Sequence, residues 1–182
     1  SADPPWPPGT RIEAARRGVL VHKLLERLPD VSGADRRDAG MHWLERNATG
    51  MEDADKSQLL DSALAVLDDP QFADLFGPGS LAEIPIAATV GARVVAGTID
   101  RLLVTPERIR IVDYKTARRP PAQIEDVPVS ILRQMAAYAA ALEQAYPGRA
   151  IDAAVLYTAT PQLIAIPDAL LIQHKQALAT TE

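Results

Sequence analysis

The stretch GTIDRLLVTPERIRIVDYKT, residues 97–116, joins two apolar runs of β-forming residues through a turn at Pro106. Asp100 interrupts the first run, and Asp113 and Lys115 lie at the end of the second. A buried strand rarely tolerates an acid and an amine unless they pair with each other or coordinate something. The stretch therefore predicts a hairpin in which the two acids and the lysine either pair with each other or coordinate a ligand.

The alternation of side chains along a strand brings the polar groups of this hairpin together. Asp113 and Lys115 point to one face and Tyr114 points to the other. Pairing about Pro106 places Asp100 close to Asp113, with Cβ atoms roughly 5 Å apart. Two carboxylates that close repel each other unless a cation lies between them.

An acid upstream can complete this cluster. Glu83, on the preceding predicted strand, can supply a third carboxylate. Hard oxygen ligands beside an amine are what a Mg²⁺ or Mn²⁺ phosphodiesterase site requires. Lys115 would then orient or activate the attacking water and offset transition-state charge. Two simpler interpretations stay open here, a plain surface ion pair for Asp113 and Lys115 and an exposed edge-strand acid for Glu83.

The patterns on both sides of the hairpin predict the fold. Apolar residues recur at helical spacing up to about residue 28 and again over 35–47, 53–67, 129–146 and 167–179. Runs rich in Val, Ile and Thr predict a meander of three antiparallel strands over 81–116 and further strands near 150–159 and 162–166. We expect an α/β domain with a mixed central sheet, an antiparallel three-strand meander, flanking helices and an N-terminal helical part. Residues 1–10 are predicted to form a proline-rich linker, and residues 11–182 the domain.

Composition narrows the class of protein. The 182 residues include 47% hydrophobic and 24% charged residues, which is typical of a globular chain. The chain has no cysteine, which excludes disulfides, thiol catalysis, thiolate zinc sites and iron–sulfur clusters. No apolar run approaches transmembrane length and the start does not resemble a signal peptide, so we expect a cytoplasmic protein.

Charge is unevenly distributed along a chain whose net charge is −5. Residues 101–119 contain six bases and two acids, and residues 11–27 contain five bases and two acids. Residues 30–83 contain twelve acids and four bases. Such an asymmetry could steer a polyanion to one face, and scattered solvated charges are an equally good interpretation of this pattern alone.

Several short motifs together resemble a known family. They are Gly-x-x-x-His at residues 18–22, EIP at 83–85, GTIDRL at 97–102, IVDYKT at 111–116 and QMAAYAAAL at 134–142. Their order is similar to that of the RecB-like nucleases of the PD-(D/E)XK superfamily, which implies the restriction-endonuclease-like fold. The resemblance is greatest to the C-terminal nuclease domain of AddA-type helicase–nuclease subunits, which process DNA double-strand breaks.

The resemblance implies roles for particular residues. It implies a metal bound by His22, Asp100, Asp113 and the backbone carbonyl of Tyr114, with Lys115 as the catalytic lysine. It implies that Glu83 helps to position the metal or the water. It also implies DNA-backbone contacts or support for Lys115 from residues beyond the hairpin, namely Gln134, Tyr138, Arg118 and Arg119; plain packing is nearly as good an interpretation of Tyr138.

The implied activity is that of a Mg²⁺- or Mn²⁺-dependent deoxyribonuclease acting on DNA, with single strands expected. It implies an upstream helicase region of the same chain that binds ATP, an AddB-type partner subunit, and a role in double-strand break repair and recombination. Some relatives carry an iron–sulfur cluster, which a chain without cysteine cannot. A free-standing RecB-like exonuclease remains an alternative, as does a catalytically silent scaffold or DNA-end-binding module.

Overall fold

The computed structural model describes residues 10–180, which form one mixed sheet with helices on both faces. The predicted linker therefore falls on residues that lie, except for Thr10, outside the described part of the chain. The helices are α1 (Thr10–Arg27), α2 (Arg36–Asn47), α3 (Asp53–Leu67), α4 (Val129–Ala145) and α5 (Asp168–Thr180). The strands are β1 (Ser80–Val90), β2 (Arg93–Val104), β3 (Arg108–Lys115), β4 (Ala150–Tyr157) and β5 (Gln162–Ile166).

The sheet has the order β1-β2-β3-β4-β5. The first three strands form the predicted antiparallel meander, β3 and β4 run parallel with α4 as the crossover, and β5 is antiparallel to β4. Gly91, with φ of 59°, occupies the first position of the two-residue turn between β1 and β2. That backbone conformation suits glycine, and such turns match the twist of a hairpin.

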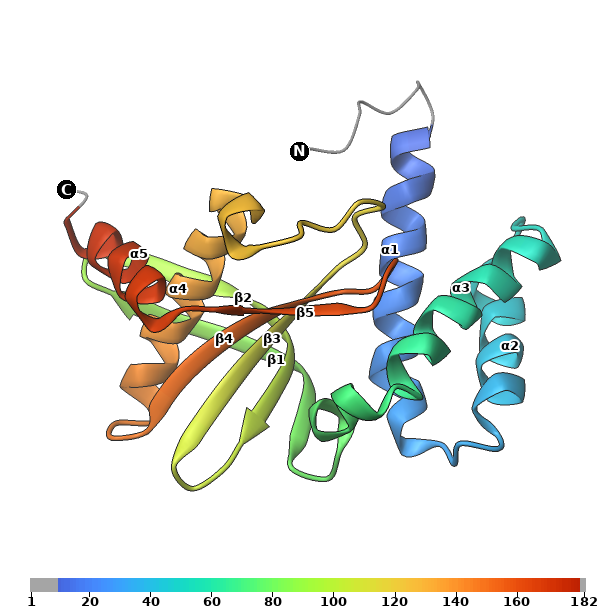
Figure 1. The fold of residues 1–182 in the computed structure, drawn as a ribbon, viewed down its shortest axis with the longest axis horizontal. Helices are drawn as coiled ribbons and strands as arrows, with labels where there is room; N and C mark the ends of the chain where they lie inside the picture. The colour runs from blue at the N-terminus through green and yellow to red at the C-terminus, as the bar shows by residue number, and fades with distance from the viewer. Residues whose placement is uncertain (1–9, 181–182) are drawn as a thin grey trace.

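The helices lie in two groups with the sheet between them, α1–α3 on one side and α4 and α5 on the other (Figure 1). Because β3 and β4 are covered on both faces, each contributes alternate residues to two separate cores. Ile109, Ile111 and Val155 belong to the core under α4 and α5. Val112, Tyr114 and Leu156 belong to the core under α1 and α3.

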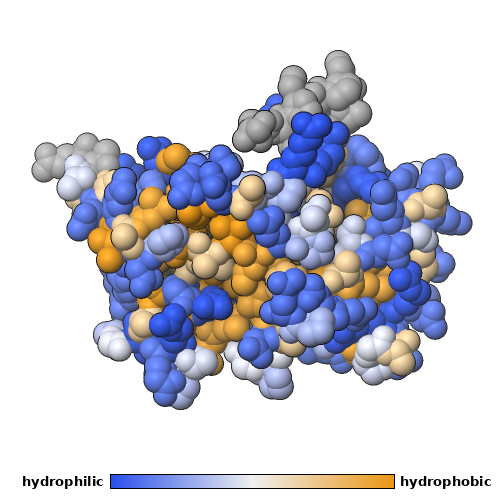
Figure 2. Space-filling view, in the orientation of Figure 1, coloured by the Kyte–Doolittle hydropathy of each residue, from blue (hydrophilic) through white to orange (hydrophobic). Residues whose placement is uncertain are grey.

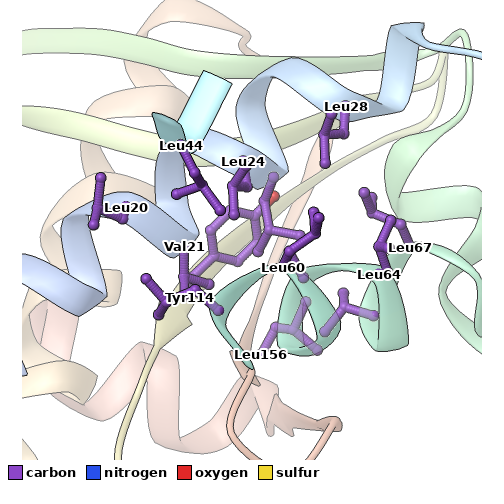
Figure 3. Close-up of a cluster of buried hydrophobic side chains, with 14 of the residues drawn as sticks. Leu20, Val21, Leu24, Leu28, Leu44, Leu60, Leu64, Leu67, Tyr114 and Leu156 are labelled. Atoms are coloured by element: carbon purple, nitrogen blue, oxygen red, sulfur yellow. The ribbon is translucent and has the colours of Figure 1, made fainter. Parts of the chain in front are cut away.

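The core beneath α1 surrounds Tyr114 (Figure 3). Helix α1 supplies one apolar stripe, with Leu20, Val21 and Leu24 all buried. Helix α3 supplies Leu60 and Leu64 from the other side. The space-filling view shows hydrophilic residues over most of the α1–α3 half of this face and apolar residues gathered over the sheet half (Figure 2). Within residues 10–180, no helix is long and apolar enough to cross a membrane.

The structure adds three short 3₁₀ segments that the sequence patterns did not predict, at Leu28–Asp30, Pro70–Phe76 and Ile124–Asp126. Two of them contain proline in their first turn, where its missing N–H costs nothing. The segment Pro70–Phe76 begins after Asp69, whose side chain accepts a hydrogen bond from the backbone N–H of Gln71. The first segment lies between α1 and α2, the second between α3 and β1, and the third between β3 and α4.

Candidate active site

The polar residues of the opening stretch meet where β2 and β3 separate. The two strands pair as far as Arg101 opposite Val112, and the next step of the same register places Asp100 at the level of Asp113. Beyond that point the backbone N–H of Tyr114 donates a hydrogen bond to Oδ2 of Asp100, at 2.7 Å. The carboxylate of Asp100 thus takes the place of a ladder acceptor at the fork between the strands. The register predicted about Pro106 is confirmed.

Asp113 and Lys115 form an ion pair that is mostly buried. The Lys115 Nζ atom lies 2.8 Å from Oδ2 of Asp113, and Asp113 is only 6% exposed. Apart from this ammonium, Oδ2 has no hydrogen-bond partner within the described residues. Burial raises the pKa of Asp113 to about 6, with the neighbouring charge of Asp100 adding to the effect and Lys115 opposing it. A buried carboxylate with an unsatisfied oxygen indicates a site prepared for something else.

His22 reaches this fork from α1. Its Nδ1 atom lies 3.4 Å from Oδ1 of Asp100, and its ring meets the ring of Tyr114 edge-on with centroids 5.4 Å apart. Burial alone would lower the pKa of His22, but the hydrogen bond to Asp100 and the charges of Asp100, Asp113 and Glu83 raise it above its usual value. His22 in turn helps to lower the pKa of Asp100, against the opposing effect of burial.

The glycine one turn before His22 explains the spacing of the Gly-x-x-x-His motif. A Cβ atom at Gly18 would lie 3.1 Å from Oγ1 of Thr116, the residue that follows Lys115. A side chain there would have to push Thr116 aside by a few tenths of an ångström, so glycine favours the close approach of α1 to the end of β3. Residues four apart lie on the same helix face, so this approach also brings His22 toward the fork.

Glu83 lies at the same level on β1. Its neighbours pair as Ala82 with Arg101 and Ile84 with Ile99, which places Glu83 opposite Asp100 although it leaves the ladder. Its φ of 51° is in the left-handed region, unlike that of any other non-glycine residue described. Residues held in such conformations gather at functional sites. Burial and the charge of Asp100 raise the pKa of Glu83, so its carboxylate interacts electrostatically with the acids at the fork.

Arg101, which sequence reasoning did not single out, fastens the strands and the helix of the site together. It is 4% exposed and donates hydrogen bonds to Leu25 O (2.8 Å) on α1, to the Tyr114 hydroxyl (3.2 Å) on β3 and to Ser80 Oγ (3.3 Å) on β1. Its guanidinium also stacks on the ring of Phe76, 5.1 Å from the centroid. No carboxylate pairs with it among the described residues, so one buried cation is satisfied by neutral acceptors and a ring. An arginine directly after a candidate ligand in an apolar strand is the signal that could have identified it.

Gln134 and Tyr138 lie on one face of α4, as their spacing predicts. Gln134 Nε2 is 3.3 Å from the Tyr138 hydroxyl, and neither residue hydrogen-bonds to Lys115 in the described structure. Tyr138 is buried against Gly97, where an added Cβ would overlap the tyrosine hydroxyl. Tyr138 therefore packs against the glycine that opens the GTID stretch. Arg118 and Arg119 are exposed on the segment after β3.

The residues at the fork suit a hard divalent cation in kind. Carboxylate oxygens and a neutral imidazole are ligands for such ions, and the buried Oδ2 of Asp113 is an unsatisfied acceptor beside the second carboxylate of Asp100. Within residues 10–180, however, no three His, Asp or Glu side chains stand close enough together to hold a metal. The cation that faces Asp113 is the Lys115 ammonium. The structure thus brings the donors to one fork without closing them into a cage.

Comparison with known proteins identifies the family. A family model described as the PD-(D/E)XK nuclease superfamily matches residues 2–179. The crystal structure of SSO0001 matches over 94% of this chain and 88% of that chain, with 12% identity and a TM-score of 0.36. A comparison with curated proteins finds no match. The family match and the mixed five-stranded sheet between two groups of helices, a restriction-endonuclease-like α/β fold, show that this chain belongs to the PD-(D/E)XK nuclease superfamily.

Proposed function

We propose that this chain is a metal-dependent deoxyribonuclease whose active site is the fork between β2 and β3. The observation that carries the proposal is Asp113, a buried carboxylate with an unsatisfied oxygen, a pKa raised to about 6, a second carboxylate beside it and an amine 2.8 Å away. Keeping mutually repelling acids together in a buried place costs stability, and a cation would relieve that cost. Membership of a nuclease superfamily supports the same activity.

The residues that would hold the ion are His22, Asp100, Asp113 and the backbone carbonyl of Tyr114. When bound, Mg²⁺ or Mn²⁺ supplies a more acidic water and neutralises charge on the phosphate. Asp100 is held in place by the Tyr114 N–H and by His22. That anchoring fixes one ligand before any ion arrives.

The other polar residues act on the substrate in this proposal. Lys115 orients the attacking water and offsets charge that develops on the phosphate. Glu83 helps to position the metal or the water from the adjacent strand. Gln134, supported by Tyr138, and the exposed Arg118 and Arg119 contact the DNA backbone.

We further propose that the domain serves an AddA-type helicase–nuclease that processes DNA double-strand breaks in the cytoplasm. The order of the motifs around the fork supports this context. In such an assembly ATP is bound by a helicase region upstream, single strands are delivered by that motor, and an AddB-type subunit is the partner. The net charge of −5 suits a nuclease whose DNA is held largely by other parts of the complex.

A test of the proposed activity is cleavage of end-labelled single-stranded DNA in a titration of Mg²⁺ and Mn²⁺. Asp113→Asn and Lys115→Met should each abolish metal-dependent cutting. Matched controls are Asp152→Asn and Lys175→Met. Asp152 on β4 pairs with Arg110 on β3, and Lys175 on α5 pairs with Glu143 on α4. Cutting that survives in the first pair of variants, or that is equally lost in the controls, would overturn the assignment.

A catalytically silent scaffold or DNA-end-binding module is the second candidate. The observation that favours it is that no three metal-binding side chains are grouped within residues 10–180. A folded protein that binds DNA ends without binding Mn²⁺ would support this candidate. Metal binding that depends on Asp113 would exclude it, even if the isolated domain cuts slowly.

A further inference from the structure

A cavity of about 710 Å³ adjoins the fork on the side of α1 and α3. It is bounded by α1, α3 and the segments that follow β3 and β4, and its lining includes Gly18, Thr116 and Thr158. Gly18 precedes His22 by one helical turn, and Thr116 follows Lys115 directly. The backbone N–H of Thr158 donates to the carbonyl of Lys115, at 3.0 Å. The cavity thus lies next to the fork, and its lining includes sequence neighbours of Lys115 and His22 but not those residues themselves.

The position of the cavity within the sheet favours ligand binding. β3 and β4 are parallel, and both end at this cavity, since Thr116 and Thr158 are the first residues after them. Open α/β sheets bind ligands outside the carboxyl ends of their parallel strands. A volume of about 710 Å³ lies within the range of small-ligand sites.

The charge of the lining favours an anion. Arg11, Arg17 and Arg118 line the cavity together with a single acid, Glu13, in a chain whose net charge is −5. Arg17 is held in place by Gln58, another lining residue, whose Oε1 lies 2.8 Å away, and by Asp55, whose Oδ1 lies 3.3 Å away. Even when Asp55 is counted, bases outnumber acids around the cavity. A pre-positioned arginine suits a phosphate, because less side-chain freedom is lost on binding.

The remaining lining has small or apolar side chains, among them Ala14, Val21 and Leu59. These leave room beside the arginines for the sugar and base of a nucleotide. Grooves for single-stranded nucleic acid combine basic groups that follow the backbone with aromatic side chains that stack on the bases. The residues that line this cavity supply the basic groups and an apolar surface that is not aromatic.

We infer that this cavity binds the nucleotide next to the scissile phosphate of a single DNA strand, with Arg11, Arg17 and Arg118 facing its phosphates. The inference rests on the proposed nuclease function and adds a path for the strand. The path leads from the fork, past α1 and the end of β3, into the space against α3. It assigns binding, and not chemistry, to the cavity.

The test measures kcat and KM for single-stranded DNA with the double variant Arg11→Glu/Arg118→Glu. We expect KM to rise about tenfold or more with kcat within about twofold, because phosphate contacts made before and during the reaction contribute uniform binding. The control is Arg93→Glu/Arg149→Glu, which changes net charge equally at the β1–β2 turn and at the amino end of β4, away from the cavity. The control should leave KM within about twofold.

Neutral variants give a second, milder measurement. Arg11→Gln and Arg118→Gln should each lower the slope of log KM against log salt concentration by about 0.7, as expected for one lost phosphate contact on a single strand. Circular dichroism establishes that each variant is folded.

The outcomes distinguish a failure of the cavity inference from a failure of the proposed nuclease function. If the wild-type protein cuts DNA but the cavity variants raise KM no more than the controls, the cavity inference is wrong and the nuclease function stands. A fall in kcat at unchanged KM would also overturn it, since that result places the arginines in the chemistry. If the wild-type protein neither cuts DNA nor binds metal, the proposed function fails and the inference fails with it.

Discussion

At the scale of single residues, the fork gives each polar group a different environment. Asp100 accepts from a backbone N–H and contacts His22, which lowers its pKa, whereas Asp113 is buried with its oxygen unsatisfied, which raises its pKa. The pairing of Asp113 with Lys115 explains in part why an acid and an amine can lie in a buried strand. The carboxylate of Asp100, whose charge helps to raise the pKa of Asp113, indicates that this single pairing does not balance the acids at the fork.

The raised pKa of Asp113 predicts how stability depends on pH in the metal-free protein. The folded state holds its proton up to about pH 6, and the unfolded chain releases it near 3.8, so this residue lowers the free energy of unfolding as pH rises between those values. Asp113→Asn removes the titration. Its effect should therefore be more stabilising at pH 7.5 than at pH 4 by about 1–3 kcal/mol.

Urea unfolding in EDTA at the two pH values checks this prediction. Asp152→Asn serves as the control, because that acid lies on the neighbouring strand and pairs with Arg108 and Arg110 instead of with Lys115. An Asp113→Asn effect that is the same at both pH values would show that the carboxylate is not held in a costly ionised state.

Arg101 predicts a large effect from a residue that does not touch the proposed ions. Arg101→Met leaves the Leu25 carbonyl, the Tyr114 hydroxyl and Ser80 Oγ without their donor. We expect a loss of about 2–4 kcal/mol in the free energy of unfolding. Tyr114→Phe, which removes one acceptor and keeps the backbone carbonyl, should cost less than half as much.

Denaturant unfolding measures both changes, with Arg37→Met as a control at an exposed arginine that pairs with Asp61. The control should stay within about 0.5 kcal/mol of the wild-type protein. If Arg101→Met lowers the free energy of unfolding no more than Arg37→Met does, Arg101 does not hold α1, β1 and β3 together.

At the scale of elements, close approaches between segments distant in sequence set the shape of the site. α1 meets the end of β3 at Gly18 and Thr116, and α4 meets β2 at Tyr138 and Gly97. In both places a motif glycine lies under a side chain of another motif. Glycine is therefore explained at both positions by close packing against a distant segment, which a single sequence pattern does not reveal.

The contact at Gly97 can be tested by adding one methyl group. A Cβ there would overlap the Tyr138 hydroxyl and lie 3.0 Å from its Cζ, so Gly97→Ala must push the buried tyrosine away. We expect a loss of about 1–3 kcal/mol in the free energy of unfolding. Gly33→Ala is the matched control, because nothing lies within 4 Å of its added Cβ.

Thermal unfolding followed by circular dichroism distinguishes the two alanine variants. Gly33→Ala should leave the midpoint unchanged or slightly raised, since alanine restricts the unfolded chain. A Gly97→Ala midpoint as high as that of Gly33→Ala would mean that Tyr138 does not pack on β2 as described.

At the scale of the whole molecule, one sheet links two apolar cores. β3 and β4 contribute alternate residues to both, such as Ile111 to one and Val112 to the other. A defect in either core should therefore weaken the whole unit, because the strands cannot leave one core and keep the other.

This linkage predicts a single unfolding transition. Met135, a fully buried residue of α4, is replaced by alanine, and Trp43 reports on the core beneath α1 in a Trp6→Phe background. Met135→Ala should lower the stability by about 2–5 kcal/mol. The fluorescence and circular dichroism transitions should shift together, whereas separate midpoints would show two independent units.

The sequence predicted those features that depend on local pattern. The helices, the meander and the Asp100–Asp113 register follow from apolar spacing and from one turn at Pro106. It did not predict the positive φ of Glu83, the three bonds of Arg101 or the cavity beside Thr116, because each depends on how segments far apart in the sequence come together. Only the tertiary structure carries that information.

The central claim is that the fork binds a divalent cation through Asp113, and calorimetric titration of Mn²⁺ into the folded domain tests it most directly. Our account predicts binding by the wild-type protein that strengthens as pH rises toward and past 6, because the carboxylate must lose its proton first. It predicts that Asp113→Asn abolishes this binding and that Asp152→Asn leaves it intact. No heat of binding in the folded wild-type protein, or equal binding by Asp113→Asn, would contradict the account.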